Sequence, residues 1–144
     1  MQLTNFQVLN ALQALNSLGQ SKLPFKLAWR VTTAIRSLDP FAKAVDEPMK
    51  EIRLKYALRD EAGNLVEAVD KDGANIPNTI QIPNDKVAIV NKEMDDLLLQ
   101  TVEVHNVEFK LSEFPDTLEL EPAVLSALTP LINDEPAQEI KLVQ

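Results

Sequence analysis

Residues 84–111, NDKVAIVNKEMDDLLLQTVEVHNVEFKL, decide the fold class, because the spacing of their apolar residues changes part-way along. Up to Leu98 the apolar side chains recur every three or four residues, which predicts a helix capped by Asn84. From residue 102 onward they alternate with polar residues, which is typical of strands with one buried face. The alternating apolar residues are Val102, Val104, Val107, Phe109 and Leu111. A helix followed directly by strands indicates an α+β protein.

The alternation changes phase at His105-Asn106, so we expect a bulge or a turn at that point. Further along, Thr117–Leu120 reads as another short strand, and Glu121-Pro122 opens a last helix because proline suits the first helical position. We therefore expect residues 1–132 to form a single helix-rich α+β domain with a small antiparallel sheet. Residues 133–144 are expected to be a loosely ordered acidic tail.

The chain before this stretch is predicted to be mainly helical. Thr4 is a good N-cap, Gln7 completes a capping box, and Gly19 is expected to end the first helix in the left-handed conformation. Pro24 helps to open a second helix with an aliphatic stripe. A new helix is expected to start at Asp39-Pro40.

Pro48 predicts a kink or a break near Asp46, because proline lacks an amide hydrogen and clashes with the preceding turn. This part of the chain therefore forms either one bent helix or two. Between it and the capping residue Asn84, two glycine-containing turns punctuate residues 60–83. Residues 65–69 and 79–82 form either a short hairpin or part of a mobile loop.

The composition excludes several classes of site. The 144 residues include no cysteine and one histidine, His105, so disulfides, thiolate chemistry and multi-histidine metal sites are ruled out within one chain. The net charge of −8 is uneven: the first 59 residues hold nine Lys/Arg against four Asp/Glu, and the rest hold five against eighteen. Such an imbalance informs about partners and solubility, and not about the fold.

We find no arrangement that predicts catalysis or a cofactor. The three glycines form no phosphate-binding loop, and Asp70-Lys71-Asp72-Gly73 reads as a turn, because a calcium loop would put Ala68 and Thr79 at ligand positions. Asp95-Asp96 is expected to be a solvated pair, and His105 to sit at a strand bend without a nucleophile and an orienting acid. We therefore expect a protein that is not an enzyme and that needs no metal or cofactor.

The best candidate for a binding site is the basic side of the second helix. Its residues are Lys22, Lys26, Arg30 and Arg36, with Trp29 beside them. These cations either remain solvated, contact phosphates, lie on anionic lipid, or pair with the acidic C-terminal part within one chain or between copies. Among the three possible contacts we favour the last, because charge complementarity orients protein contacts. Trp29 either belongs to this contact surface or packs in the core.

Most of the chain resembles a family of small acidic proteins encoded by tailed bacteriophages and their prophages. The matching stretches are Leu3–Leu12, Leu15–Leu18, Lys22–Ala28, Asp95–Leu98, Glu103-Val104, Leu111–Glu113 and Leu118–Ile132. Pro40 and Pro48 depart from the more continuous charged helix of that family. The family has no assigned activity, so the resemblance implies no catalytic residues and only a context, namely a viral gene product made in a bacterial cytoplasm.

Together these observations predict a non-enzymatic bacteriophage protein that acts through protein–protein contacts, as a minor virion component or an assembly factor. The alternative is an inhibitor of a bacterial defence system that sequesters a host enzyme or signalling ligand. The expected partners are other phage proteins or a second copy of the chain, without a membrane or nucleic acid. With no apolar run of about 20 residues and no signal peptide, the expected location is the virion or the host cytoplasm.

Overall fold

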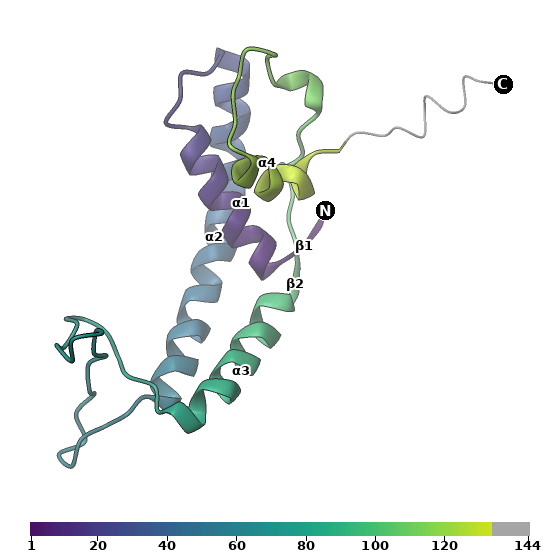
Figure 1. Ribbon diagram of the computed structural model, residues 1–144. Helices are drawn as coiled ribbons and strands as arrows, with labels where there is room; N and C mark the ends of the chain where they lie inside the picture. Colours follow the sequence, from purple (N-terminus) through teal and green to yellow (C-terminus); the bar gives the residue numbers. More distant parts are fainter. Residues whose placement is uncertain (134–144) are drawn as a thin grey trace. The chain divides into compact units, whose positions relative to one another are not determined.

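The computed structural model describes residues 1–133 and confirms a helix-rich α+β fold with a small antiparallel sheet (Figure 1). The chain groups into two compact units. Unit 1 contains residues 1–42 and the residues from 101 onward, and unit 2 contains residues 43–100. The single domain over 1–132 stays a prediction. Apart from Asn133, the predicted acidic tail lies outside the described residues.

Helix α1, Asn5–Leu18, begins with the predicted capping box in unit 1. The Gln7 amide donates to the Thr4 hydroxyl over 3.1 Å, and the Thr4 amide donates to the Gln7 side-chain carbonyl over 2.9 Å. Two amides that lack helical partners are thereby satisfied, which fixes where α1 starts.

We expect Thr4→Ala to lower the free energy of unfolding by about 1 kcal/mol, because the helix loses its N-cap acceptor. Thr4→Ser keeps the hydroxyl and should stay close to the wild type. Urea unfolding followed by circular dichroism measures both. Equal losses for the two variants would show that the methyl group of Thr4, and not its hydroxyl, stabilises this end of α1.

The end of α1 differs from the prediction at Gly19. Its φ is −65°, so it is not left-handed. The chain instead continues the last turn tightly: the amides of Gln20 and Ser21 donate to the carbonyls of Ser17 and Leu18, over 3.2 and 3.1 Å. These bonds satisfy the carbonyls that a left-handed glycine would otherwise serve.

The sheet of unit 1 joins the N-terminus to the start of the unit's second chain segment. Strand β1, Gln2–Thr4, pairs antiparallel with β2, Thr101–Glu103, so that Leu3 lies opposite Val102. The sequence did not predict β1, because three residues are too short to show a period. Leu3 is buried and extends the core that α1 begins.

The turn at His105-Asn106 is confirmed. Asn106 adopts a φ of +63°, and Val104 and Val107 are both buried on either side of it. The predicted strand through Leu111 is wrong. Phe109 forms only an isolated parallel bridge with Ile132, and Leu111–Glu113 forms the 3-10 turn η2. Val107 and Phe109 are buried as the alternation predicts, but a single bridge does not form the repeated hydrogen bonds of a β-sheet.

The strand predicted at Thr117–Leu120 is also wrong. The Leu118 amide donates to the Pro115 carbonyl in a turn, and no strand is assigned to this segment. The last helix is confirmed as α4, Pro122–Leu128, with proline at its start, followed by the 3-10 turn η3, Thr129–Leu131. Helix α4 packs on α1 (Figure 1). The core of unit 1 joins both helices to the first part of α2 and to Val104, Val107 and Phe109.

Helix α2, Phe25–Tyr56, runs without interruption through both prolines. The new helix predicted at Asp39-Pro40 is therefore wrong, and of the two alternatives left open at Pro48 the chain forms one helix rather than two. Each interior proline removes one backbone hydrogen bond, yet its φ fits a helix. Buried Leu38 and Val45 lie on either side of Pro40, and this packing offsets the loss.

In unit 2, helix α3, Val87–Leu99, follows a 3-10 turn η1, Asn84–Lys86. Asn84 does not cap the helix. The Lys86 amide donates instead to the Pro83 carbonyl, over 2.9 Å. A tight turn that starts at Pro83 thus takes the place of the predicted side-chain cap.

Between α2 and η1, two turns repeat one design ten residues apart. The Asp60 carboxylate accepts from the amides of Ala62 and Asn64, and the Asp70 carboxylate accepts from those of Asp72 and Ala74, all over 2.9–3.0 Å. Gly63 and Gly73 have φ of +83° and +82° in the two turns, a conformation that favours glycine. The two turns take the place of the predicted hairpin between residues 65–69 and 79–82. One backbone hydrogen bond joins these two segments, from the Gln81 amide to the Val66 carbonyl.

One ion pair in unit 2 links the end of α2 to α3. Lys55 Nζ lies 3.3 Å from Glu93 Oε1. The neighbouring Tyr56 side chain, and then Lys55, lower the pKa of the Glu93 carboxyl below its usual 4.5. This contact therefore contributes stability above about pH 4.5, and loses it as the pH falls through the lowered pKa.

Candidate partner-binding face

Two large aromatic side chains stand exposed at the start of α2. Phe25 is 82% exposed and Trp29 is 60% exposed. They are four residues apart, so they are neighbours on one side of the helix. The core takes the opposite side, where Leu27, Val31 and Leu38 are buried. Trp29 is therefore a surface residue and does not pack in the core.

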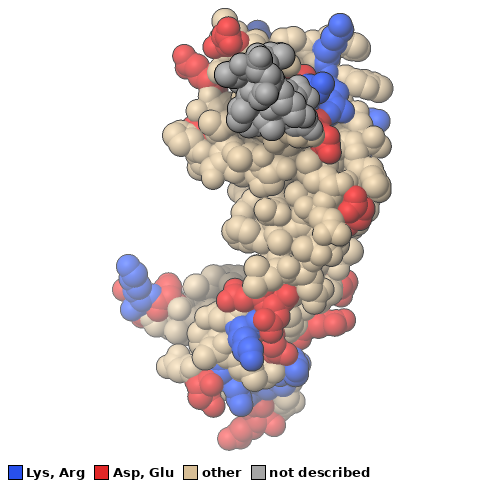
Figure 2. All heavy atoms as spheres, turned by 90° about the vertical axis from the view of Figure 1, so that its right-hand side faces the viewer, with Lys and Arg blue, Asp and Glu red and all other residues tan. Residues whose placement is uncertain are grey.

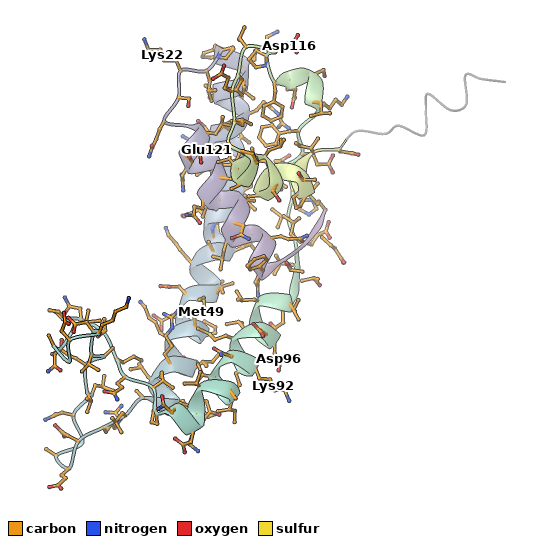
Figure 3. All side chains as sticks on the ribbon, in the orientation of Figure 1. Lys22, Met49, Lys92, Asp96, Asp116 and Glu121 are labelled. Atoms are coloured by element: carbon orange, nitrogen blue, oxygen red, sulfur yellow. The ribbon has the colours of Figure 1, made fainter. Side chains whose placement is uncertain are left out.

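Three of the four predicted cations surround these aromatic residues without forming ion pairs. Lys22, Lys26 and Arg36 are exposed, and within residues 1–133 none of them pairs with a carboxylate. Lys22 extends from the loop before α2 toward solvent (Figure 3). The charge of this side of α2 is thus available to a partner.

Arg30 differs from these three cations, because it already contacts other residues of unit 1. Its guanidinium donates to the Glu108 carbonyl, and its Nε lies 3.5 Å from Glu113 Oε1. The same group stacks over the Phe109 ring, 5.3 Å from the centroid. Arg30 therefore fastens the start of α2 to the segment that follows β2.

We expect Arg30→Ala to lower the free energy of unfolding by about 2 kcal/mol, since it removes charged hydrogen bonds and a cation–π contact. The expected loss is smaller than the sum of the separate contacts, because the Arg30–Glu113 ion pair is one third exposed and solvent weakens it. The matched control is Lys26→Ala on the same helix, which should leave the melting temperature unchanged. Equal melting temperatures for the two variants would contradict the anchoring role of Arg30.

These residues define the basic–aromatic face: Lys22, Phe25, Lys26, Trp29 and Arg36, with Arg30 at its edge. Aromatic residues and arginine are the types that most often dominate the energy of protein interfaces. Phe25 was not among the residues predicted for this site. The signal was present, because Phe25 stands one helical turn before Trp29 on the side away from the aliphatic stripe.

The other residues singled out in the sequence show no comparable cluster. His105 is exposed at its bend, and Asp95 and Asp96 are exposed on α3, where Asp96 points away from the helix (Figure 3). Within residues 1–133 no group of three acidic or histidine side chains is placed to hold a metal ion. In unit 2, acidic and basic side chains lie side by side on the face that Figure 2 shows (lower part).

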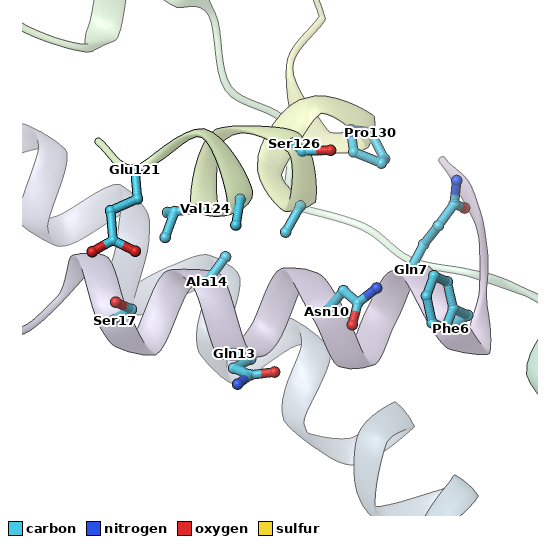
Figure 4. A pocket seen from close by; sticks show the side chains of 12 residues that line it. Phe6, Gln7, Asn10, Gln13, Ala14, Ser17, Glu121, Val124, Ser126 and Pro130 are labelled. Carbon is cyan, nitrogen blue, oxygen red and sulfur yellow. The ribbon is translucent and has the colours of Figure 1, made fainter. Parts of the chain in front are cut away.

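A groove lies between α1 and α4 in unit 1 (Figure 4). Its volume is about 640 Å³, and Asn10 and Ser17 from α1 face Val124 from α4 and Glu121 before it. The residues that line it include no lysine, arginine or histidine. An anionic ligand would therefore meet no opposite charge there.

Comparisons with known proteins add no relative. Scans of the chain against protein-family models, curated proteins and solved structures gave no match. In the part of the chain that the structure describes, no helix combines the length and the apolar character needed to cross a membrane.

Proposed function

We propose that this protein is a non-enzymatic bacteriophage protein that acts through protein–protein contacts, as a minor virion component or an assembly factor. The basic–aromatic face is its contact surface. One observation carries the proposal: Phe25 and Trp29 are exposed side by side on α2, and the cations Lys26 and Arg36 on that helix and Lys22 just before it form no ion pairs within residues 1–133. Exposed aromatic side chains with surrounding charge are typical of interface centres.

The rigidity of the face supports the same proposal. Arg30 ties this end of α2 to Glu113 and to the Glu108 carbonyl, and Leu27 and Val31 hold it in the core. A side chain that is positioned before binding loses less conformational entropy on contact. The aromatic pair is thus presented on a fixed element.

Mass spectrometry of purified particles from the phage or prophage that encodes the chain tests the role. The protein should occur at a fixed copy number per particle, or in purified assembly intermediates if it is an assembly factor. Absence from both, together with restored phage growth on a defended host when the chain is expressed alone, would instead support the inhibitor of a defence system.

Site-specific cross-linking tests the surface. A photo-reactive amino acid at Trp29 should cross-link to one defined protein during infection. The matched position is Ile89 on α3, an exposed apolar residue of unit 2 that should give no such product. Cross-linking at Ile89 but not at Trp29 would move the contact surface to unit 2.

A further inference from the structure

The acidic residues after η2 form a second exposed surface in unit 1. Asp116, Glu119 and Glu121 are exposed, and within residues 1–133 none of them forms an ion pair. No basic residue follows Lys110 in the described part of the chain. Leu125, one helical turn after Glu121, is 45% exposed and adds an apolar side chain. We call these four residues the acidic surface.

The two surfaces of unit 1 are complementary. The basic–aromatic face offers two aromatic side chains and three cations that form no ion pair within residues 1–133, and the acidic surface offers three carboxylates and an exposed leucine. No ion pair joins the two surfaces within residues 1–133. In the upper part of Figure 2, acidic side chains stand at the left margin of unit 1, and basic side chains lie toward the right, where acidic side chains also occur.

We propose that the basic–aromatic face of one copy binds the acidic surface of a second copy, head to tail. The proposal rests on the proposed function and names its partner. Because every chain carries one of each surface, the contact repeats and produces either a closed ring or an open row of subunits. A symmetric pairing of two basic–aromatic faces is disfavoured, since it would bring lysines of both copies together.

Unit 1 already contains one contact of the same kind. Arg30, a cation of α2, pairs with Glu113, a carboxylate of the segment that leads to the acidic surface. Lys22, Lys26 and Arg36 lie on the same helix end or just before it, and Asp116, Glu119 and Glu121 follow Glu113 in the chain. The proposed contact extends this pairing from one chain to two.

Sedimentation of the full chain after nuclease treatment tests the proposal. At about 0.05 M salt the mean mass should rise with concentration above the 16.1 kDa of one chain. At about 1 M salt it should return to that mass, because the screening length shrinks to about 3 Å. Oligomers that persist at high salt would overturn the proposal. Oligomers that disappear after nuclease treatment alone would also overturn it, and would show that a nucleic acid occupies the basic–aromatic face.

Paired variants make the test specific. Lys26→Glu with Trp29→Ala removes one surface, and Glu119→Lys with Glu121→Lys removes the other. Each should weaken self-association by about 30-fold. Mixed together, they should form a 1:1 complex that grows no further, because one intact face meets one intact acidic surface. Circular dichroism verifies folding, and Lys92→Glu on α3 is the charge-matched control, expected to assemble like the wild type.

Two results would overturn the inference. Either a wild type that stays monomeric at all concentrations, or a variant mixture that forms no complex while both variants are folded, excludes a second copy as the occupant. The proposed function fails separately. If the wild type is monomeric but Trp29 still cross-links to another protein during infection, the proposed contact surface stands and its partner is a different protein.

Discussion

Phe109→Ala should lower the free energy of unfolding by about 4 kcal/mol, the largest loss expected from one side chain of this protein. The Phe109 ring is 2% exposed, lies under the Arg30 guanidinium, and is 5.6 Å from the Phe114 ring. The alanine variant leaves a cavity in the core of unit 1 and also removes the surface on which Arg30 stacks. Chemical unfolding followed by circular dichroism measures the loss.

Leu111→Ala provides the matched control. The alternating pattern predicts the same burial for Leu111 as for Phe109, but Leu111 starts the turn η2 and is 51% exposed. We expect a change within about 0.5 kcal/mol, as for other surface substitutions. Similar losses for the two variants would mean that the segment forms the longer strand that the sequence predicts.

Pro40→Ala should raise the free energy of unfolding by about 2 kcal/mol. Pro40 is exposed in the interior of α2, where proline is about 3 kcal/mol less favourable than alanine. The gain is smaller than this difference, because proline also restricts the unfolded chain by up to about 1 kcal/mol. The alanine amide can donate to the Arg36 carbonyl, which proline leaves without its helical donor.

The control for this prediction is Pro122→Ala. Pro122 stands at the start of α4, where the missing amide hydrogen has no helical acceptor to serve. This variant should show no increase in the free energy of unfolding. Urea unfolding measures both variants, with one common dependence of the free energy on urea concentration. A gain at Pro122 as large as that at Pro40 would show that the benefit does not come from the restored helical hydrogen bond.

The features that depend on residues close together in the sequence were predicted correctly. The capping box at Thr4 and Gln7, the turn at His105-Asn106 and the proline at the start of α4 all form as the residues indicate. In each case the deciding contact lies within four residues in the chain, or the residue itself restricts the backbone. The fold class followed from the same patterns.

The errors come from partners that lie far away in the sequence. Strand β1 depends on β2, about 100 residues later, and Phe109 finds one bridging partner at Ile132 instead of a second strand. Helix α2 continues through Pro40 because packing of its apolar stripe outweighs the local signal to stop. Composition alone does not specify any of these contacts.

The candidate site was predictable in part. The cations of the second helix follow from their spacing, and the exposure of Lys22, Lys26 and Arg36 agrees with a polar side of that helix. The anchoring of Arg30 was not predictable, because its partners Glu108 and Glu113 reach it only through the fold. Spacing alone also left two positions open for Trp29, and the packing of α2 decided between them.

The division of unit 1 into two chain segments has a consequence for synthesis on the ribosome. Residues 43–100 leave the exit tunnel as one continuous piece, and each of the tandem turns closes over five residues. Unit 1 completes its fold later, because the Met1 carbonyl accepts from the Val104 amide, 103 residues further along the chain, and the Phe109 amide donates to the Leu131 carbonyl. Its N-terminal helices therefore emerge with their apolar sides uncovered, and the nascent chain should rely on holding factors until its last turns are translated.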